Sequence, residues 1–474
     1  MPSPRWTTPT ALLVAALLTA GCGARWDEDQ RAAMTAGGGT GMLVADEGGR
    51  GTTSRSEART GAMTPSAADA ATTPGAPGAT GDPAAPGAAA TDGGADAGEA
   101  AASGPRPCDA PSEAPGIADD TITIATVNSV TGPVPGLGTT SEAAARAYVA
   151  YRNATGGVCG RQVELVAVDD GTDAGRFRAA IVEMLPKVIG IGGLFANGDA
   201  GGAQLVEEAQ LPVVGAASTT QFQDVSTVFD VNPPPADLGA VIEKYRYLKQ
   251  QGVTKAAVIT LSNAAAVAEL DVHQAQMEAA GIPVVSRQVL PVATLSFDSA
   301  ARQVANSGAD YLFFLAAENH DAALARAMRD SGYDLEFEEY LTGYGDKYPA
   351  QAGPAAEGTS SWIRSLPNED GGANPEQAAF LEWMERVAPG TAPDVYAAQG
   401  WVGAKGLLDA MEQLPGPITR EAIVAQLRAT TSFDAGGFFG DIDLGNERSK
   451  GCLIGMRHEG GQWRRMTPAQ AFLC

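Results

Sequence analysis

A strand–helix–strand unit between residues 121 and 170 constrains the fold of this chain more than any other segment. Residues 121–127 are rich in Thr, Ile and Val, which is typical of a strand. A loop with Gly and Pro follows, then residues 141–153 predict a helix that ends at Gly156-Gly157, and residues 163–170 predict a second strand. In such a βαβ unit the first loop lies at the carboxyl edge of the sheet, where open α/β sheets bind ligands.

The same alternation of strands and helices continues along the chain. It is interrupted at Pro233-Pro234-Pro235, where a proline triplet suggests a crossing between domains, and it restarts afterwards. Strands that alternate with helices indicate parallel sheets, so the pattern predicts two α/β lobes within the 474 residues. Further strands are expected at residues 188–192, 211–215, 255–261, 283–289, 309–316 and 358–365.

Residues 1–22 predict a targeting segment. The apolar run 11–18 is too short to span a bilayer, and Leu18-Thr19-Ala20-Gly21-Cys22 resembles a lipoprotein signal with Cys22 as the lipidated residue. Thr19 stands where that pattern usually has an aliphatic residue, so a plain secretory signal is the alternative. Residues 23–107 are mostly Ala, Gly, Thr, Pro, Asp and Ser, which predicts a disordered tether, with a small hidden domain as the alternative.

Four cysteines follow Cys22, and an even number in an exported chain indicates disulfides. Three pairings are possible. Because Cys108 and Cys159 each come just before a predicted strand, and adjacent parallel strands start at the same edge of a sheet, we expect these two to pair. Cys452 and Cys474 flank a predicted last hairpin and would form the second bond. Metal binding is the alternative, but no CxxC or HxxxH spacing supports it, so no metal site is predicted.

Charge and composition argue against several function classes. A net charge of −24 repels phosphate backbones, and 6% aromatic residues offer few stacking surfaces, so no nucleic-acid partner is expected. His273 falls in a predicted helix, His458 in the last hairpin, and His320 has no nucleophile beside it in the sequence. No GxSxG elbow, P-loop or GxGxxG motif occurs in a βα turn. We therefore expect no enzymatic activity and no cofactor.

Short motifs between residues 119 and 466 resemble, in their order and spacing, the periplasmic binding proteins of branched-chain amino acid ABC transporters. The resemblance implies an α/β fold of two doubly wound parallel-sheet lobes joined by three crossovers, with the ligand in a cleft closed by hinge motion. It implies a first lobe of residues 118–232 plus about 358–440 and a second lobe of residues 233–357 plus about 441–474. The motifs are Thr131-Gly132-Pro133, Gly156-Gly157-x-x-Gly160-Arg161, Asp169-Asp170, Leu211-Pro212-Val213-Val214 before Ala217-Ser218-Thr219, and Ala355-Ala356-Glu357-Gly358.

The resemblance also implies a place for the ligand. In the family, loops at the carboxyl ends of first-lobe strands hold the zwitterion, and the matching segments here contain Ala196-Asn197 and Ala217-Ser218-Thr219. Free N–H groups at helix starts and the Thr219 hydroxyl have the chemistry to hold a carboxylate or an amide. The alternative is that Ser218 and Thr219 merely cap a turn.

Several positions depart from the family pattern. A serine that helps to hold the carboxylate is usual at Ala196, where Asn197 is a possible substitute, and an aromatic residue is common at Leu137. The Tyr-Gly of the second lobe falls on Ala265-Ala266, and the acidic acceptor for the ligand's ammonium group falls near Tyr344. The α-amino acid clamp is therefore largely missing, which predicts a ligand that is less zwitterionic, or bulkier, than leucine.

Two side chains of the second lobe are candidates for ligand contact. Glu318 follows the strand predicted at 309–316 and would supply a negative charge, with solvated surface as the alternative. Tyr344 lies between Gly343 and Gly345 and would stack on a ligand, with a loop tyrosine that shields the hinge as the alternative.

These features together favour a monomeric, extracytoplasmic lipoprotein at the outer face of the cytoplasmic membrane. It would deliver a small organic ligand, amino-acid-like or an amide, to the permease of an ABC importer. A sensor or scaffold that uses the same fold without transport is one alternative, and an extracellular hydrolase on an α/β scaffold is the other.

Overall fold

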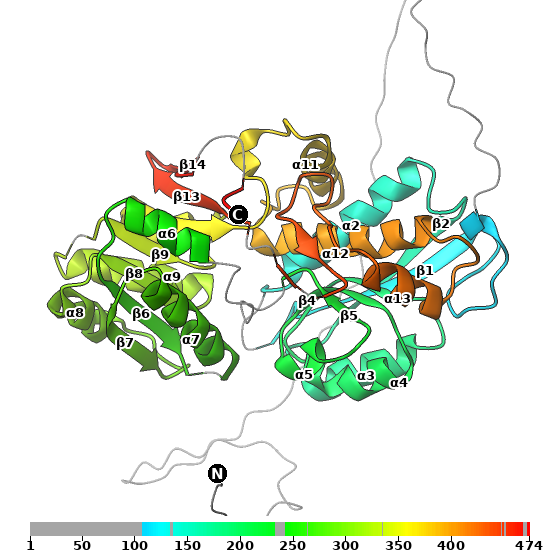
Figure 1. Ribbon diagram of the computed structural model, residues 1–474, viewed down its shortest axis with the longest axis horizontal. Helices are drawn as coiled ribbons and strands as arrows, with labels where there is room; N and C mark the ends of the chain where they lie inside the picture. The colour runs from blue at the N-terminus through cyan, green and yellow to red at the C-terminus, as the bar shows by residue number, and fades with distance from the viewer. Residues whose placement is uncertain are drawn as a thin grey trace, which may run out of the picture. The chain divides into compact units, whose positions relative to one another are not determined.

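The structure, a computed structural model, describes residues 107–132, 136–232, 242–262, 264–333, 335–446, 448–449, 452–467 and 472–474. The signal segment, Cys22, the tether up to residue 106 and the proline triplet at 233–235 lie outside the described residues. Figure 1 shows that the described part of the chain contains two large sheets, each with helices on both faces, and a short two-stranded pair, β11 (Ile442–Asp443) and β12 (Arg448–Ser449).

The first sheet is parallel and has the strand order β2-β1-β3-β4-β5. Two of its strands begin and end later than predicted, because the apolar run continues through Leu194 and Ala196, both buried. Ala196 and Ala217 are therefore the last residues of strands and pair with one another. The strands are β1 (Thr121–Asn128), β2 (Gln162–Asp169), β3 (Ile191–Ala196), β4 (Val213–Ala217) and β5 (Val228–Asp230).

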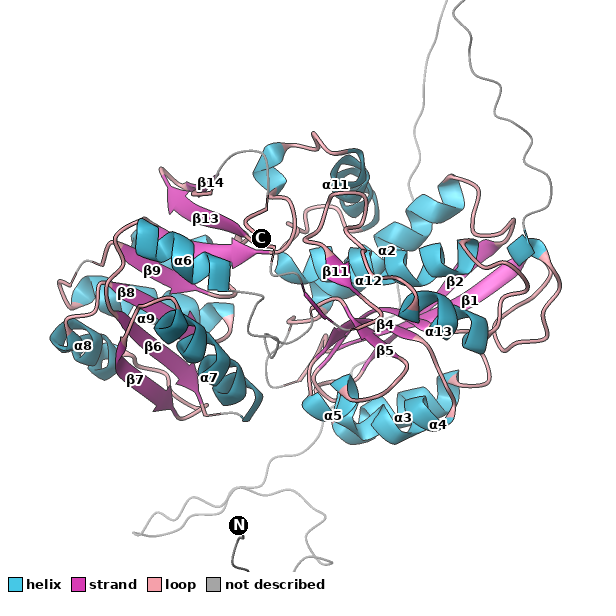
Figure 2. Cartoon of the chain, viewed as in Figure 1, coloured by secondary structure: helices cyan, strands magenta, loops and turns pink. Residues whose placement is uncertain are grey.

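Alternate residues of these strands face opposite layers of helices. Ile122 and Ile124 pack in a core with α2 and α12, whereas Ala125 and Val127 pack in a second core with α3 and α4. Figure 2 shows both layers. The helices of this lobe are η1 (Pro107–Asp109), α2 (Thr139–Ala154), α3 (Ala174–Met184), η2 (Asp199–Gly202), α4 (Ala203–Glu208), α5 (Thr220–Gln223), α11 (Pro375–Val387), α12 (Val395–Glu412) and α13 (Arg420–Arg428).

The second sheet has the order β14-β13-β10-β9-β8-β6-β7, and β6 to β10 run parallel. Helices α6 and α7 cover one face, and α8, α9 and α10 cover the other. Its strands are β6 (Ala256–Leu261), β7 (Val284–Leu290), β8 (Tyr311–Leu315), β9 (Phe337–Tyr340), β10 (Thr359–Ile363), β13 (Ile454–Glu459) and β14 (Gln462–Arg465). Its helices are α6 (Ile242–Gln250), α7 (Ala264–Ala279), α8 (Asp298–Ser307), α9 (Glu318–Asp330), α10 (Lys347–Ala352), η3 (Gly353–Ala356) and η4 (Asn368–Asp370).

Strand β10 corrects one part of the predicted division into lobes. The sequence analysis placed residues from about 358 onward in the first lobe, but β10 pairs in parallel with β9 and antiparallel with β13. The chain returns to the first lobe only after β10, with α11, and leaves it again after the short pair β11 (Ile442–Asp443) and β12 (Arg448–Ser449). Ile442 still packs in the first-lobe core. The architecture is thus two doubly wound lobes with three crossings between them.

Both predicted disulfides are confirmed. Cys108 and Cys159 are bonded with their Cα atoms 5.7 Å apart, and Cys452 and Cys474 with theirs 4.1 Å apart. The second bond encloses the hairpin of β13 and β14.

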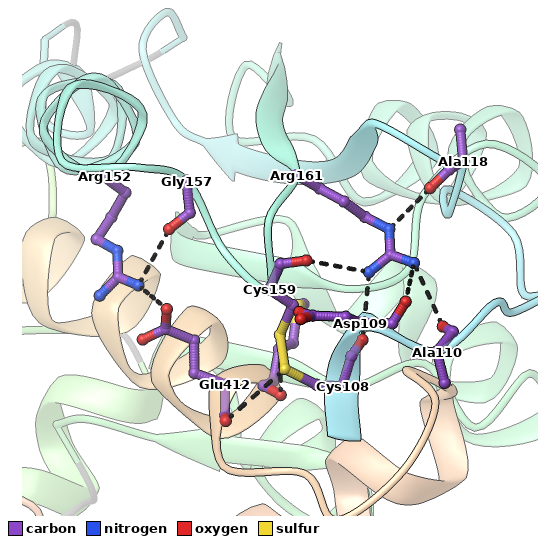
Figure 3. Close-up of a disulfide and its surroundings, with 10 residues drawn as sticks. Cys108, Asp109, Ala110, Ala118, Arg152, Gly157, Cys159, Arg161 and Glu412 are labelled. Atoms are coloured by element: carbon purple, nitrogen blue, oxygen red, sulfur yellow. Dashed lines mark hydrogen bonds and ion pairs between the residues drawn. A yellow bond between two sulfur atoms is a disulfide. The ribbon is translucent and has the colours of Figure 1, made fainter. Parts of the chain in front are cut away.

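The first disulfide lies beside a buried arginine, as Figure 3 shows. The Arg161 guanidinium donates to the backbone oxygens of Cys108 and Cys159, at 3.2 and 3.3 Å, and of Ala118, at 2.9 Å. Gly157 shares this turn at φ +75°, and a Cβ atom on it would lie 2.0 Å from the Arg161 carbonyl oxygen. The Gly156-Gly157-x-x-Gly160-Arg161 motif therefore builds the turn that holds the N-terminal segment on the first lobe.

Within the described ranges, no helix has both the length and the apolar composition that a membrane-crossing helix requires.

Candidate ligand-binding site

Two aspartates at the end of β2, the last strand residue Asp169 and the following Asp170, organise the loops at the carboxyl edge of the first sheet. Asp169 Oδ1 accepts the backbone N–H groups of Val130 and Thr131, each at 3.0 Å, and of Gly171 at 2.9 Å. The Thr131 hydroxyl donates to Oδ2 at 2.5 Å. Burial alone would raise the pKa of Asp169, but these hydrogen bonds hold it well below its usual range. The loop after β1 is thereby fixed around an ionised carboxylate.

Asp170 points to a different loop, as expected for neighbouring residues at the end of a strand. Its carboxylate accepts the Ser129 hydroxyl at 2.7 Å, the Gly198 N–H at 2.8 Å and the Thr172 N–H at 3.0 Å. The Asn197 N–H donates to the Ser129 hydroxyl oxygen at 2.9 Å. The N–H groups of Asn197 and Gly198, at the end of β3, therefore already have acceptors inside the protein.

Asp199, the first residue of η2, accepts the hydrogen bonds of the loop that follows β4. It is fully buried and accepts the Ser218 N–H at 2.6 Å, the Thr219 N–H at 3.3 Å and the Thr219 hydroxyl at 2.6 Å. The Thr219 oxygen also caps α5 by accepting the Phe222 N–H at 3.3 Å. Burial raises the pKa of Asp199 to about 6, although these hydrogen bonds oppose the shift.

The start of α12 brings the two lobes into contact beside this edge. The Tyr396 ring lies 4.6 Å, centroid to centroid, from Phe195 at the end of β3. Asp394, the N-cap of α12, has its Oδ2 atom 4.0 Å from Lys347 Nζ of α10, and the same Nζ lies 3.8 Å from Glu318 Oε2. Burial raises the pKa of Glu318, and the Lys347 charge partly offsets this rise. Glu318 thus lies next to a first-lobe residue, at the first turn of α9.

An apolar hollow lies beside the same edge. It has a volume of about 180 Å³ and lies between the loop after β1, helix α2 and the end of α11. Its apolar lining comes from Val130, Ala143, Val387 and Ala388, and the polar residues Thr139, Glu142 and Arg146 complete it. Sites for whole drug-sized molecules usually measure about 300–1,000 Å³, so this hollow has room for only an apolar part of a ligand.

Of two further predicted contacts, Tyr344 has partners within the protein, and Leu137 stays a prediction. Tyr344 is only 3% exposed, donates its hydroxyl to Glu369 at 2.8 Å and accepts the Asn368 N–H at 2.7 Å. Its ring packs near Trp463 of β14, so this side chain already has polar and aromatic partners within the protein. Leu137 lies half-buried in the turn before α2.

Sequence reasoning named the loops after β3 and β4 but did not predict that Asp199 accepts the donors of the second loop, or that the start of α12 lies nearby. Asp199, Asp394 and Tyr396 were not predicted as site residues. Asp394 precedes an apolar helix, which is an N-cap signal, and its side chain does accept the N–H groups of Tyr396 and Ala397 at 3.0 Å. An N-cap signal does not indicate that the same aspartate also lies near Lys347 of the second lobe.

Comparison with known proteins identifies the family. Residues 121–460 match the model of the family described as "Periplasmic binding protein". This chain belongs to the periplasmic binding protein family. A relative described as Leu/Ile/Val-binding protein homolog 7, from Brucella abortus (strain 2308), is 24% identical over 384 residues, which are 76% of this chain and 94% of the relative.

Solved structures of other binding proteins show the same fold. A fatty acid ABC transporter substrate-binding protein from Thermomonospora curvata aligns with a TM-score of 0.64 and 20% identity over 77% of this chain and 95% of its own. A leucine binding protein from Thermotoga maritima aligns with a TM-score of 0.61 and 20% identity over 73% of this chain and 97% of its own. The chain therefore has the fold of a type I periplasmic binding protein.

Asp199 gives a pH-dependent test of this geometry. Its folded-state pKa of about 6 exceeds the ordinary value of 3.8, so the folded state binds the proton more tightly than the unfolded chain. This contribution to stability is present at low pH and disappears as pH rises from about 4 through about 6. We expect the unfolding free energy of the wild type, relative to Asp199→Asn, to fall by about 2 kcal/mol between pH 4.5 and pH 7.5. Urea denaturation of both proteins measures this, and equal differences at the two pH values would contradict it.

Proposed function

We propose that this protein is an extracytoplasmic solute receptor that captures a small organic molecule between its two lobes and delivers it to an ABC permease. The observation that carries the proposal is the family match over residues 121–460 together with two doubly wound lobes that are joined by three crossings. In such sheets ligands bind at the carboxyl ends of the strands, and hinged domains close around them. Lipidation of Cys22 would hold the receptor, as a monomer, at the outer face of the cytoplasmic membrane.

We further propose that the ligand is less zwitterionic, or bulkier, than leucine. Ala196 at the end of β3 is buried and supplies no hydroxyl, and Tyr344 is already engaged within the protein. The apolar hollow beside Val130 offers room for a hydrocarbon part. The relatives differ in ligand, since one is named for leucine and another for fatty acids, so the fold alone does not determine the choice.

Ligand-induced stabilisation tests the proposal. The mature protein with Cys22→Ser is heated in the presence of a panel of metabolites, and a true ligand at 100 times its Kd should add about 2.7 kcal/mol to the stability. We expect at least one compound to raise the Tm by a few degrees, and titration calorimetry should show no micromolar binding of leucine. Micromolar leucine binding would refute the ligand class while the receptor function stands.

A sensor or scaffold is the second candidate. It is favoured by one observation, that the loop N–H groups of Asn197, Gly198, Ser218 and Thr219 already donate to partners within the protein. If no compound in a broad panel stabilises the protein, transport is contradicted and the scaffold is favoured.

A further inference from the structure

The donors at the end of β4 converge on one carboxylate that belongs to the protein. The N–H groups of Ser218 and Thr219 reach Asp199 Oδ2 at 2.6 and 3.3 Å, and the Thr219 hydroxyl reaches Oδ1 at 2.6 Å. Two backbone donors and a hydroxyl around one carboxylate form an effective anion site, because hydrogen bonds to an ionised acceptor are strong. Each of these groups carries one hydrogen, so the same site is not open to a ligand carboxylate.

The N–H groups of the loop after β3 also have acceptors within the protein. The Gly198 N–H donates to Asp170 at 2.8 Å, and the Asn197 N–H donates to Ser129, whose own hydroxyl donates to Asp170. Gly198 connects two buried carboxylates: its N–H donates to Asp170, and Asp199 is the next residue along the chain. A third carboxylate brought to this edge would meet like charges instead of free donors.

Carboxylates of both lobes lie at the contact beside the start of α12, Asp394 on the first lobe and Glu318 on the second. The backbone N–H of Tyr396 donates to Asp394 Oδ1 at 3.0 Å, and Lys347 Nζ lies between Asp394 and Glu318, at 4.0 and 3.8 Å. Asp321 of α9 is not counted among these acceptors, because it is fully buried, accepts the Thr342 hydroxyl at 2.8 Å, and has a pKa that burial raises well above its usual range. Lys347 is the cation near Glu318 and Asp394, and its half-exposed ammonium lies no closer than 3.8 Å to either. A donor or a positive charge on a ligand would find acceptors here.

We propose that Asp199 is a specificity-determining residue that occupies the anion site of the first lobe with its own carboxylate, so that the ligand is a neutral or cationic molecule with hydrogen-bond donors and no free carboxylate. An amide or an amine fits this description. The inference rests on the proposed function and specifies its ligand class.

The test compares four compounds that share one branched hydrocarbon group: isovaleramide, isoamylamine, isovalerate and leucine. Titration calorimetry at pH 7.5 is run on the wild type, Asp199→Ala and Asp199→Asn, each checked for folding by circular dichroism. We expect Asp199→Ala to bind isovalerate at least tenfold more tightly than the wild type, because the donors of Ser218 and Thr219 become free. Asp199→Asn removes the charge but keeps an acceptor oxygen, so its gain should be smaller.

Asp173→Ala is the matched control. Asp173 is an exposed carboxylate in the adjacent loop that caps α3 through the Arg176 N–H at 2.7 Å. Its removal changes the local charge by the same amount without freeing the donors at the end of β4, so isovalerate binding should stay at the wild-type level. An equal gain in Asp173→Ala would show a general charge effect and would overturn the role of Asp199.

The outcomes separate this inference from the proposed function. If the metabolite that most stabilises the wild type carries a free carboxylate, or if folded Asp199→Ala gains no affinity for isovalerate, the inference is wrong while the receptor function stands. If a neutral or cationic compound stabilises the wild type most and Asp199→Ala gains isovalerate binding, the inference is supported. If no metabolite stabilises the wild type, the proposed function fails, and the Asp199→Ala titration still decides whether the donors form a masked anion site.

Discussion

Replacing Lys244 with alanine is expected to lower the free energy of unfolding by about 3–5 kcal/mol. Lys244 Nζ lies 2.6 Å from Glu339 Oε1, and the two side chains are 1% and 0% exposed. The second carboxylate oxygen of Glu339 accepts the Tyr311 hydroxyl at 2.5 Å. Without the ammonium group, a carboxylate is left uncompensated in the core of the second lobe. Guanidinium denaturation of the variant and the wild type at pH 7 measures the loss.

An exposed ion pair provides the control for this prediction. Lys187 Nζ lies 2.9 Å from Glu183 on the surface of the first lobe, where the side chains are 57% and 76% exposed. Such a pair contributes about 0.3–0.5 kcal/mol, so Lys187→Ala should change little. Combining Lys244→Met with Glu339→Gln should recover most of the stability, because no unpaired charge then remains in the core. A Lys244→Ala loss no larger than that of Lys187→Ala would refute the prediction.

Removing the disulfide between Cys108 and Cys159 should cost about 4 kcal/mol. The bond closes a loop with a sequence separation of 51 residues, and a cross-link of that length removes much conformational entropy from the unfolded chain. The variant with both cysteines replaced by serine should therefore unfold at lower denaturant concentration, and the slope of the transition should rise because its unfolded chain is less compact.

The second disulfide is the internal comparison. Cys452 and Cys474 are separated by only 22 residues, so replacing both with serine should cost about 3 kcal/mol, less than the first pair. Denaturation of the wild type under reducing conditions should approach the sum of the two losses. The reverse ranking would mean that local contacts, and not loop closure, decide the contribution of each bond.

The sequence was sufficient to predict the α/β class and the two lobes, because both depend on alternation within short stretches. Both disulfides were predictable because their cysteines lie next to predicted strand starts or flank a predicted hairpin. Strand β10 shows where such patterns end. The alternation around Thr359 and Ile363 indicates a strand, but the choice of sheet depends on its pairing with β9 and with β13, the latter about 95 residues further along the chain. No local pattern encodes that partner, and the boundary between the lobes was therefore placed too early.

The candidate site shows a similar limit. The resemblance placed Ser218 and Thr219 at a ligand loop, and the structure places both side by side at the end of β4. Whether their donors are open depends on Asp199, which lies 19 and 20 residues earlier in the sequence. An aspartate after glycine at a helical turn predicts a local cap, so its long-range partners were not predictable from its neighbours alone.

The described part of the chain starts on one lobe and finishes on the other. The segment that enters at Pro107 is fixed to the first lobe by Cys108, and the terminal Cys474 is fixed beside β13 of the second lobe. Fluorescent dyes attached near these two positions would therefore report opening and closing of the two lobes as a change in resonance energy transfer. Because a disulfide holds each position on its own lobe, the dyes would follow the lobes closely. If the receptor is held at the membrane through residues before Pro107, the first lobe stays close to the anchor, and the second lobe is the one that moves when the cleft closes.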